Sequence, residues 1–375
     1  MKNSFRISEK RYLRRLEWIR AISCVLVLFY HLNILKGGYL AVCTFLVISG
    51  YLSCTSALNN SNFSAKSYYK KRFIKLYIPL IFTVALSVVI VKCINDIRWI
   101  NLKQETISVV FGYNNFWQLK ANLDYFTRHI DSPFMHLWYI SILIQFDLFF
   151  PIIFVFLRKI EKKYKNNVSV IVVGLCSIIL TIMFFYMSKT QNIMEVYYNT
   201  FTRVFSIFYG VFLALILHKY NMKLPKVLVK NNKIIFMIYC LVLFLLGIFV
   251  SAEENNYAIY MIITSLISVR LIRYSLFEKK KRRSTFIDKV VSFIAKFSYE
   301  IYLAQYPIIF LMQSISDSNV INTLFIIVFT FIISFLIHTL VYKHFANKYL
   351  NAIKKIFIRI DFNNKLFYSC NRERL

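Results

Sequence analysis

Apolar runs of about twenty residues recur along the chain and are separated by short polar segments. A helix needs about 20 apolar residues to cross the hydrocarbon core of a bilayer. The pattern predicts an all-α fold, a polytopic membrane helical bundle of about ten transmembrane helices. The expected spans are 16–35, 38–57, 74–92, 135–157, 168–187, 200–218, 234–251, 256–272, 290–312 and 320–342. A ten-residue shift around Glu253 would turn the seventh and eighth spans into one re-entrant element.

Composition agrees with this pattern, because 58% of the residues are hydrophobic and only 17% are charged. An ordinary soluble domain of this length is much less apolar. We therefore expect one transmembrane domain over 1–375, in which 343–375 forms a short basic tail. From Lys348 onward this tail alternates apolar and basic residues, which is typical of an interfacial amphipathic helix.

Charge is distributed unevenly between the gaps. The two tails and every second gap hold 37 of the 47 Lys and Arg residues, against seven in the other gaps. Positive segments are retained in the cytoplasm, so both termini are predicted to be cytoplasmic. The net charge of +30 then indicates anionic lipids as partners and no nucleic acid. A multi-pass protein of the cell membrane, most simply a bacterial plasma membrane, is expected.

Two further features are read as structural. The first apolar run carries charged residues and lacks a small-residue cleavage site, so no removable signal peptide is expected. The seven cysteines are scattered without paired metal spacing, so they are predicted to be buried small hydrophobes, and no metal is expected. The long external segment 93–134 contains several aromatic residues and is expected to cover the outer mouth as a lid or interfacial loop.

Ionisable groups inside apolar spans are costly and usually serve function. The first span contains Glu17, Arg20 and His31. Arg20 and His31 are eleven residues apart, so they share one helix face about 16 Å apart along the axis. Glu17, three residues before Arg20, is placed to pair with it. The alternative is that Glu17 and Arg20 only reach the inner interface and that His31 is a satisfied buried histidine.

The remaining polar residues are sorted by depth with the same topology. Three lie towards the outer leaflet: His136, Arg203 and Gln305. Three lie towards the inner leaflet: Arg72, Lys75 and His338. Cations at the inner surface suit phosphate groups, although ordinary positive-inside charge explains them equally well. Asp147, deep in the fourth span, has no evident partner.

These residues sit in stretches that resemble acyltransferase family 3, the integral membrane acyltransferases. The opening stretch from Glu17 through Arg20 to His31 resembles the family's first motif, and the stretch ending Ser49-Gly50-Tyr51-Leu52 resembles its second-helix motif. Four later stretches resemble further motifs: Lys71-Arg72 to Pro79, His136-Leu137-Trp138 with Pro151, Thr202-Arg203 with Gly210, and Ser298-Tyr299 to Leu303 with Pro307. The six ordered stretches cover residues 14–310.

The resemblance implies an O-acyltransferase. Such a protein takes an acyl group, commonly acetyl from acetyl-CoA at the cytoplasmic face, and passes it to a hydroxyl of an extracytoplasmic or lipid-linked cell-surface polysaccharide. Acyl-CoA would be the donor substrate, with no cofactor bound permanently. By position, Arg72 and Lys75 would hold the phosphates of the donor. His31 would be the general base or a transient acyl carrier, with Arg20 and Glu17 on the same helix and His136 and Arg203 as orienting groups.

The chain departs from the family pattern at three places. Lys75 stands where the family often has Arg, Leu143 and Ile144 stand where many members have acidic residues, and Gln305 stands where many have His. Many members also carry a fused C-terminal hydrolase-like domain. This chain resembles stand-alone members, so it is expected to act alone, to self-associate or to use a separate extracytoplasmic partner.

Two other function classes fit the same features. Ten spans with charges inside them also suit a transporter or flippase for a glycan or lipid-linked oligosaccharide. The residues show no internal repeat, and with 7 Gly and 5 Pro the chain has little material for broken helices. A non-catalytic scaffold for glycan synthesis is the third reading.

Overall fold

The computed structural model describes residues 9–94, 101–126, 132–164, 167–220, 231–252, 256–276, 285–315 and 320–341, and all regular structure in these ranges is helical. The tail after Lys348 lies outside the described residues. The first elements are α1 (Glu9–His31), η1 (Gly38–Leu40), α2 (Ala41–Leu58), α3 (Ala65–Arg72), η2 (Phe73–Tyr77), α4 (Ile78–Ile94), α5 (Leu102–Val110) and α6 (Asn114–Lys120). The later ones are η3 (Met135–Leu137), α7 (Trp138–Tyr164), α8 (Val168–Thr190), α9 (Ile193–Tyr198), α10 (Thr200–Tyr220), α12 (Asn232–Phe249), α13 (Tyr257–Ser275), α14 (Phe286–Ile315) and α15 (Val320–Val341).

Within the described ranges, eight helices are long and apolar enough to cross a membrane. They are Gly38–Leu58, Ala65–Cys93, Met135–Tyr164, Val168–Thr190, Thr200–Tyr220, Asn232–Phe249, Tyr257–Ser275 and Val320–Val341. The protein is therefore an all-α polytopic membrane bundle, as predicted. Helices α1 and α14, with 23 and 30 residues, are the two further long helices where spans were expected. Helices α12 and α13 are separate elements. The orientation of the termini stays a prediction.

Helices α2 and α10 pack extensively against each other, and each contributes a glycine to the contact. A Cβ on Gly50 would lie 2.1 Å from the carbonyl oxygen of Ile207, and one on Gly210 would lie 2.0 Å from that of Val47. Only glycine lets two helix backbones approach this closely, as small residues do in many membrane helix pairs. The crossing fixes the depth at which α10 presents Arg203.

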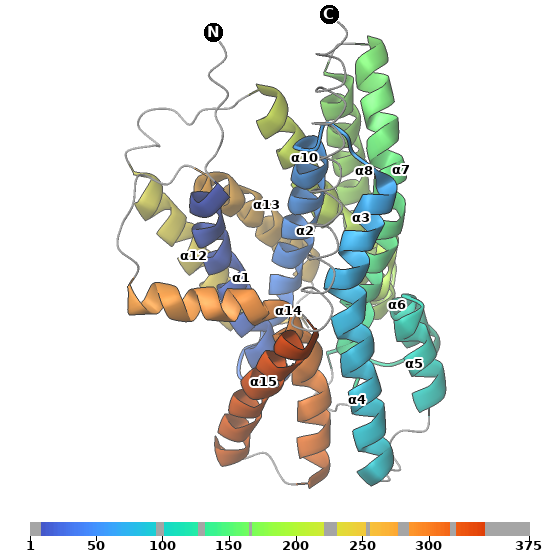
Figure 1. Cartoon of the computed structure of the whole chain (residues 1–375), viewed down its shortest axis with the longest axis vertical. Helices are drawn as coiled ribbons and strands as arrows, with labels where there is room; N and C mark the ends of the chain where they lie inside the picture. The colour runs from blue at the N-terminus through green and yellow to red at the C-terminus, as the bar shows by residue number, and fades with distance from the viewer. Residues whose placement is uncertain are drawn as a thin grey trace, which may run out of the picture.

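Helix α14 bends, and its two parts reach different neighbours. In Figure 1 its first part lies across the bundle, whereas its second part runs alongside α15 and α4. Helix α14 also packs against α1. Because of this bend, α14 contributes side chains to two separate polar clusters that α1 also reaches.

Candidate active site

The first polar cluster, called here the histidine cluster, consists of His31, His136, Tyr125 and Tyr306. His31 is the last residue of α1 and its side chain is buried. Its Nε2 atom lies 2.7 Å from the hydroxyl of Tyr125, and its ring lies edge-on to Tyr306 with centroids 4.9 Å apart. The Nδ1 atom has no hydrogen-bond partner among the described residues. His31 therefore keeps one ring nitrogen available for a substrate proton.

The second histidine of the cluster lies in the short η3 helix that precedes α7. The ring of His136 stacks on Tyr306 at 4.9 Å and 19°, and its centroid is 6.0 Å from that of His31. Its backbone carbonyl accepts a hydrogen bond from Tyr302, which fixes η3 against α14. Both ring nitrogens of His136 are buried and lack a partner among the described residues. Buried polar atoms are rarely left unpaired, so the two ring nitrogens of His136 are candidates for binding a substrate.

The segment 101–126, which supplies Tyr125, is held by buried amides. The Asn115 side chain donates to the carbonyl of Tyr198 and to the hydroxyl of Thr200, each at 3.0 Å. It also accepts a bond of 2.9 Å from Gln145 in α7. This segment, residues 101–126, is called here the cap, and it is thus packed against α7, α9 and α10. Burial raises the pKa of the Tyr125 phenol above its ordinary value, so it is protonated at neutral pH.

Arg203 in α10 lies behind this cap and is fully buried. Its guanidinium lies between the rings of Trp138 and Tyr197, at 5.4 and 4.9 Å from their centroids. Its Nη1 and Nη2 atoms point at the sulfur atoms of Met261 and Cys43. Among the described residues no carboxylate pairs with it, and its Nε atom has no partner. A buried cation stabilised only by rings and sulfur attracts negative charge that forms nearby.

The second polar cluster, called here the cationic cluster, contains Arg20, Arg72 and Lys75 together with Asp147 and Glu300. Arg72 and Asp147 form an ion pair at 2.8 Å. The same Asp147 oxygen accepts a 2.6 Å bond from Tyr68, and Arg72 donates to the hydroxyl of Ser53 at 2.6 Å. Asp147, which had no evident partner in the sequence, is thus the counter-ion of Arg72.

Arg20 and Lys75 complete the positive side of this cluster. Arg20 donates to the hydroxyl of Ser298 at 2.8 Å. No close ion pair joins it to Glu17 within the described residues, and Glu17 acts on it only through longer-range electrostatics. Lys75 is exposed and within electrostatic reach of both Arg20 and Arg72. It sits in η2, a π-helical turn, and such turns are frequent at functional sites.

Glu300 supplies the second carboxylate of the cationic cluster. It pairs with His338 of α15 at 2.9 Å. Its other oxygen has no hydrogen-bond partner in the described part of the chain, although the carboxylate interacts electrostatically with Arg20 and Lys75. The inner histidine of the sequence therefore has a counter-ion. Among the described residues no carboxylate is bonded to Lys75, so a substrate anion can meet this cation without breaking an ion pair.

Three elements connect the two clusters. Helix α1 carries Arg20 and His31, and η3 with α7 carries His136 and Asp147, each pair eleven residues apart. Eleven residues of helix correspond to about 16 Å. Helix α14 adds Glu300 at one cluster and Tyr306 at the other. The two clusters thus share the same helices and lie about 16 Å apart along α1.

Comparison with known proteins identifies this architecture. Residues 13–339 match the family described as an acyltransferase domain, Acyl_transf_3. The chain belongs to acyltransferase family 3. This protein is therefore an integral membrane acyltransferase, and the family resemblance noted in the sequence is confirmed.

Its curated relatives are O-acetyltransferases by name. A Staphylococcus aureus (strain COL) protein named as an O-acetyltransferase is 31% identical over 321 residues, which cover 81% of this chain and 52% of the relative. O-acetyltransferase OatA of Staphylococcus aureus (strain NCTC 8325) is 30% identical over 320 residues, with the same coverage. The chain thus spans about half the length of the curated relatives it matches. No solved structure matches the acyltransferase significantly.

The structure brings the predicted site residues of this acyltransferase into two groups. His31 and His136 meet in the histidine cluster with Arg203 behind it, whereas Arg20, Arg72 and Lys75 meet in the cationic cluster. Glu17 is partly buried on α1, and Gln305 is buried with its amide unpaired among the described residues. Within the described ranges, no three His, Cys, Asp or Glu side chains are placed to hold a metal ion.

Sequence reasoning missed three members of the site. Glu300 lies inside a predicted span, so a complete search for ionisable groups in apolar runs would have found it. Tyr125 and Tyr306 gave no such signal, because tyrosines are common in this chain and most serve packing or the interface. Only the folded arrangement places these two hydroxyl-bearing rings against His31.

Proposed function

We propose that this acyltransferase moves an acyl group, in the simplest case acetyl, from cytoplasmic acyl-CoA to a hydroxyl of an extracytoplasmic or lipid-linked cell-surface glycan. The observation that carries the proposal is the pair of clusters joined by α1, with cations at one end and, at the other, a histidine nitrogen that has no partner among the described residues. Membership of the family and relatives named as O-acetyltransferases support the same reaction class. The predicted cytoplasmic side of the cationic cluster supports the donor's entry there.

His31 is proposed as the general base of the transfer. An imidazole with a free nitrogen takes the proton from the acceptor hydroxyl while the hydroxyl oxygen attacks the thioester carbonyl. The carbon–sulfur bond breaks as the new carbon–oxygen bond forms, and the proton returns from His31 to the departing thiolate. The products are the O-acylated glycan and free CoA. The 2.7 Å contact with Tyr125 supports this role, because it holds the ring at one orientation.

The donor's phosphates are proposed to bind at the cationic cluster. Cations suit phosphate oxygens, and within the cationic cluster Lys75 and Arg20 have no bonded carboxylate among the described residues. Arg72 contributes through its ion pair with Asp147, which fixes the π-helical turn beside it. The part of its positive charge that Asp147 does not neutralise also attracts phosphate. The arm of CoA would then run along α1 towards His31.

Three other residues are proposed to orient the reaction. Arg203 stabilises negative charge that develops on the thioester oxygen, since no carboxylate among the described residues neutralises it. His136, whose two ring nitrogens lack a hydrogen-bond partner among the described residues, holds the acceptor hydroxyl beside His31. Glu17 lies one turn from Arg20 on α1 and supports its charge at the donor end.

The deciding experiment follows free CoA released from acetyl-CoA by purified protein reconstituted in vesicles that contain the native surface-glycan fraction. We expect release by the wild-type protein and its loss in His31→Ala, with both proteins equally folded by size-exclusion chromatography. No release and no donor binding by folded wild-type protein would contradict the proposal. In that case, movement of the glycan across the vesicle membrane would assign the chain to the transporter class.

A further inference from the structure

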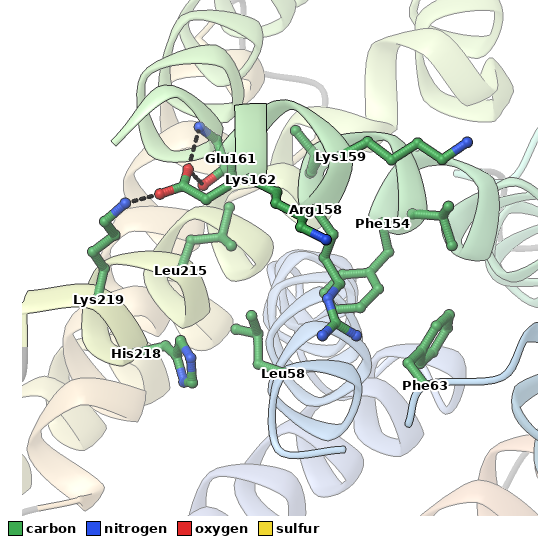
Figure 2. A pocket seen from close by; sticks show the side chains of 13 residues that line it. Leu58, Phe63, Phe154, Arg158, Lys159, Glu161, Lys162, Leu215, His218 and Lys219 are labelled. Atoms are coloured by element: carbon green, nitrogen blue, oxygen red, sulfur yellow. Dashed lines mark hydrogen bonds and ion pairs between the residues drawn. The ribbon is translucent and has the colours of Figure 1, made fainter. Parts of the chain in front are cut away.

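A cleft of about 760 Å³ opens between the ends of α2, α7, α8 and α10 (Figure 2). None of its lining residues belongs to the histidine cluster or the cationic cluster. One wall is apolar and consists of Leu58, Phe63 and Phe154, with the two phenyl rings in edge contact at 4.8 Å. Basic side chains from α7 and α10 also line the cleft. The cleft therefore combines an apolar surface with concentrated positive charge.

The back of the cleft is held together by Glu161. Its carboxylate accepts bonds from the backbone amide of Ser169 at 3.0 Å and from the Ser169 hydroxyl at 2.6 Å, which ties α7 to the start of α8. It also pairs with Lys219 of α10. Three helices are thus fixed around the cleft. Because Lys219 and Glu161 neutralise each other, the remaining basic side chains of the lining keep their full charge.

Two of those side chains come from one face of α7. Arg158 and Lys162 are four residues apart, so they lie one above the other on the helix. Figure 2 shows the Arg158 guanidinium between Leu58 and Phe63 and the Lys162 side chain on the same side of the cleft. Lys163 follows directly in sequence but does not line the cleft, and its ammonium lies 5.1 Å from the centroid of the Tyr164 ring. The chain therefore offers a matched control next to the site.

We propose that this cleft binds the phosphodiester headgroup of an anionic glycerophospholipid, with Arg158 and Lys162 on the phosphate and the acyl chains along the apolar wall. A cationic pair suits a phosphate oxygen pair, and guanidinium does so in a fixed geometry. The aromatic wall gives inorganic phosphate no favourable contact, whereas it offers apolar contact area to a lipid tail. Basic pockets at the ends of membrane helices bind lipid headgroups by this combination. The site is distinct from the proposed donor site and does not depend on it.

The test measures retained lipid and needs no acyl donor. Purified protein is equilibrated with mixed micelles containing equal amounts of phosphatidylglycerol and phosphatidylcholine, and bound lipid is counted by native mass spectrometry. We expect wild type to retain phosphatidylglycerol selectively. Arg158→Gln and Lys162→Gln should each weaken that retention roughly fivefold, and Lys163→Gln should leave it within about twofold.

Three results would overturn the proposal. Equal phosphatidylglycerol retention by wild type and Arg158→Gln/Lys162→Gln would place the lipid elsewhere. An equal loss in Lys163→Gln would show diffuse attraction to the basic end of the bundle. Displacement of the lipid by adenosine 3′,5′-bisphosphate in wild type would assign the phosphate site to a soluble nucleotide. Loss of phosphatidylglycerol selectivity in Arg158→Gln/Lys162→Gln, with CoA release intact, would still support the lipid site. The lipid proposal and the acyl-transfer proposal therefore fail independently.

Discussion

The hydroxyl of Tyr125 lies 2.7 Å from Nε2 of His31, and this contact joins the cap to the end of the first helix. The cap is anchored separately through Asn115 to α9, α10 and α7. His31 is therefore oriented by a part of the chain nearly a hundred residues away. The position of the cap therefore determines the orientation of the proposed base.

Tyr125→Phe is the direct test of this contact. The variant removes the hydroxyl and keeps the ring that packs against Tyr197 at 5.2 Å. We expect CoA release to fall roughly tenfold with donor KM unchanged, because one hydrogen bond that orients the base is lost. Tyr113→Phe, an exposed phenol in the same segment, is the control and should stay near wild type. Equal rates for Tyr125→Phe and wild type would remove Tyr125 from the site.

His31→Ala should abolish the proposed base. Loss of a general base lowers rates by roughly 10²–10⁴-fold, so we expect CoA release dependent on the glycan to fall by that amount. Donor binding, measured by equilibrium dialysis of labelled acetyl-CoA, should change little because the cationic cluster is intact. A well-folded His31→Ala protein that transfers at the wild-type rate would end the assignment.

Lys75→Ala should separate donor binding from chemistry. Lys75 is the exposed cation of its cluster and has no bonded carboxylate among the described residues, so its loss removes attraction for phosphate. We expect the KM for acetyl-CoA to rise roughly five- to tenfold with kcat within about twofold, which corresponds to about 1 kcal/mol of lost binding. Lys71→Ala, an exposed lysine one turn earlier, serves as the control. A KM that rises equally in both variants would indicate general charge attraction in place of a site.

Arg72 and Asp147 should behave as one unit in stability. Arg72→Ala leaves Asp147 buried and unpaired, and breaking a buried pair in this way costs about 3–5 kcal/mol. We expect a clear fall in the thermal midpoint of the detergent-solubilised protein. Adding Asp147→Asn to Arg72→Ala should recover part of it, since the stranded charge is gone. Additive losses in the double variant would show that the two side chains are not coupled.

Two glycines at helix contacts, Gly210 at the crossing of α2 and α10 and Gly174 in α8, are expected to differ in their sensitivity to alanine. A Cβ on Gly210 would meet the Val47 carbonyl at 2.0 Å, where backbone must move, so Gly210→Ala should destabilise the protein by about 1–3 kcal/mol or more. A Cβ on Gly174 meets only the outer edge of the Phe212 ring at 2.9 Å, which can rotate away. Gly174→Ala should be milder in the same thermal unfolding assay. A milder effect at Gly210 would contradict the close crossing.

The bilayer explains why the membrane-spanning helices could be predicted from the sequence. A lipid-facing helix must be apolar for about twenty residues, so each span carries its own signal without reference to its neighbours. The same logic singled out Arg20, His31, Arg72, Lys75 and Arg203, because charge in an apolar run is conspicuous. The helical spacing of Arg20 and His31 also needed only α1, which runs unbroken from Glu9 to His31.

The sequence could not predict which residues form hydrogen bonds and ion pairs between distant helices. Glu17 is three residues from Arg20 and was expected to pair with it, yet Arg20 bonds to Ser298 on α14. Asp147 had no sequence partner and found Arg72 75 residues away. Local spacing allows a pair, but the packing of a distant helix decides whether a nearer group takes the hydrogen bond.

The sequence by itself determined the helical membrane fold, the chemical class and the residues that carry charge. The tertiary structure alone decided which of those charges are neutralised, that His31 meets Tyr125 and Tyr306, and that a basic cleft forms between α7 and α10. The reason is physical: burial in lipid acts on each segment separately, whereas hydrogen bonds and ion pairs act over a few ångströms and depend on how distant segments come together.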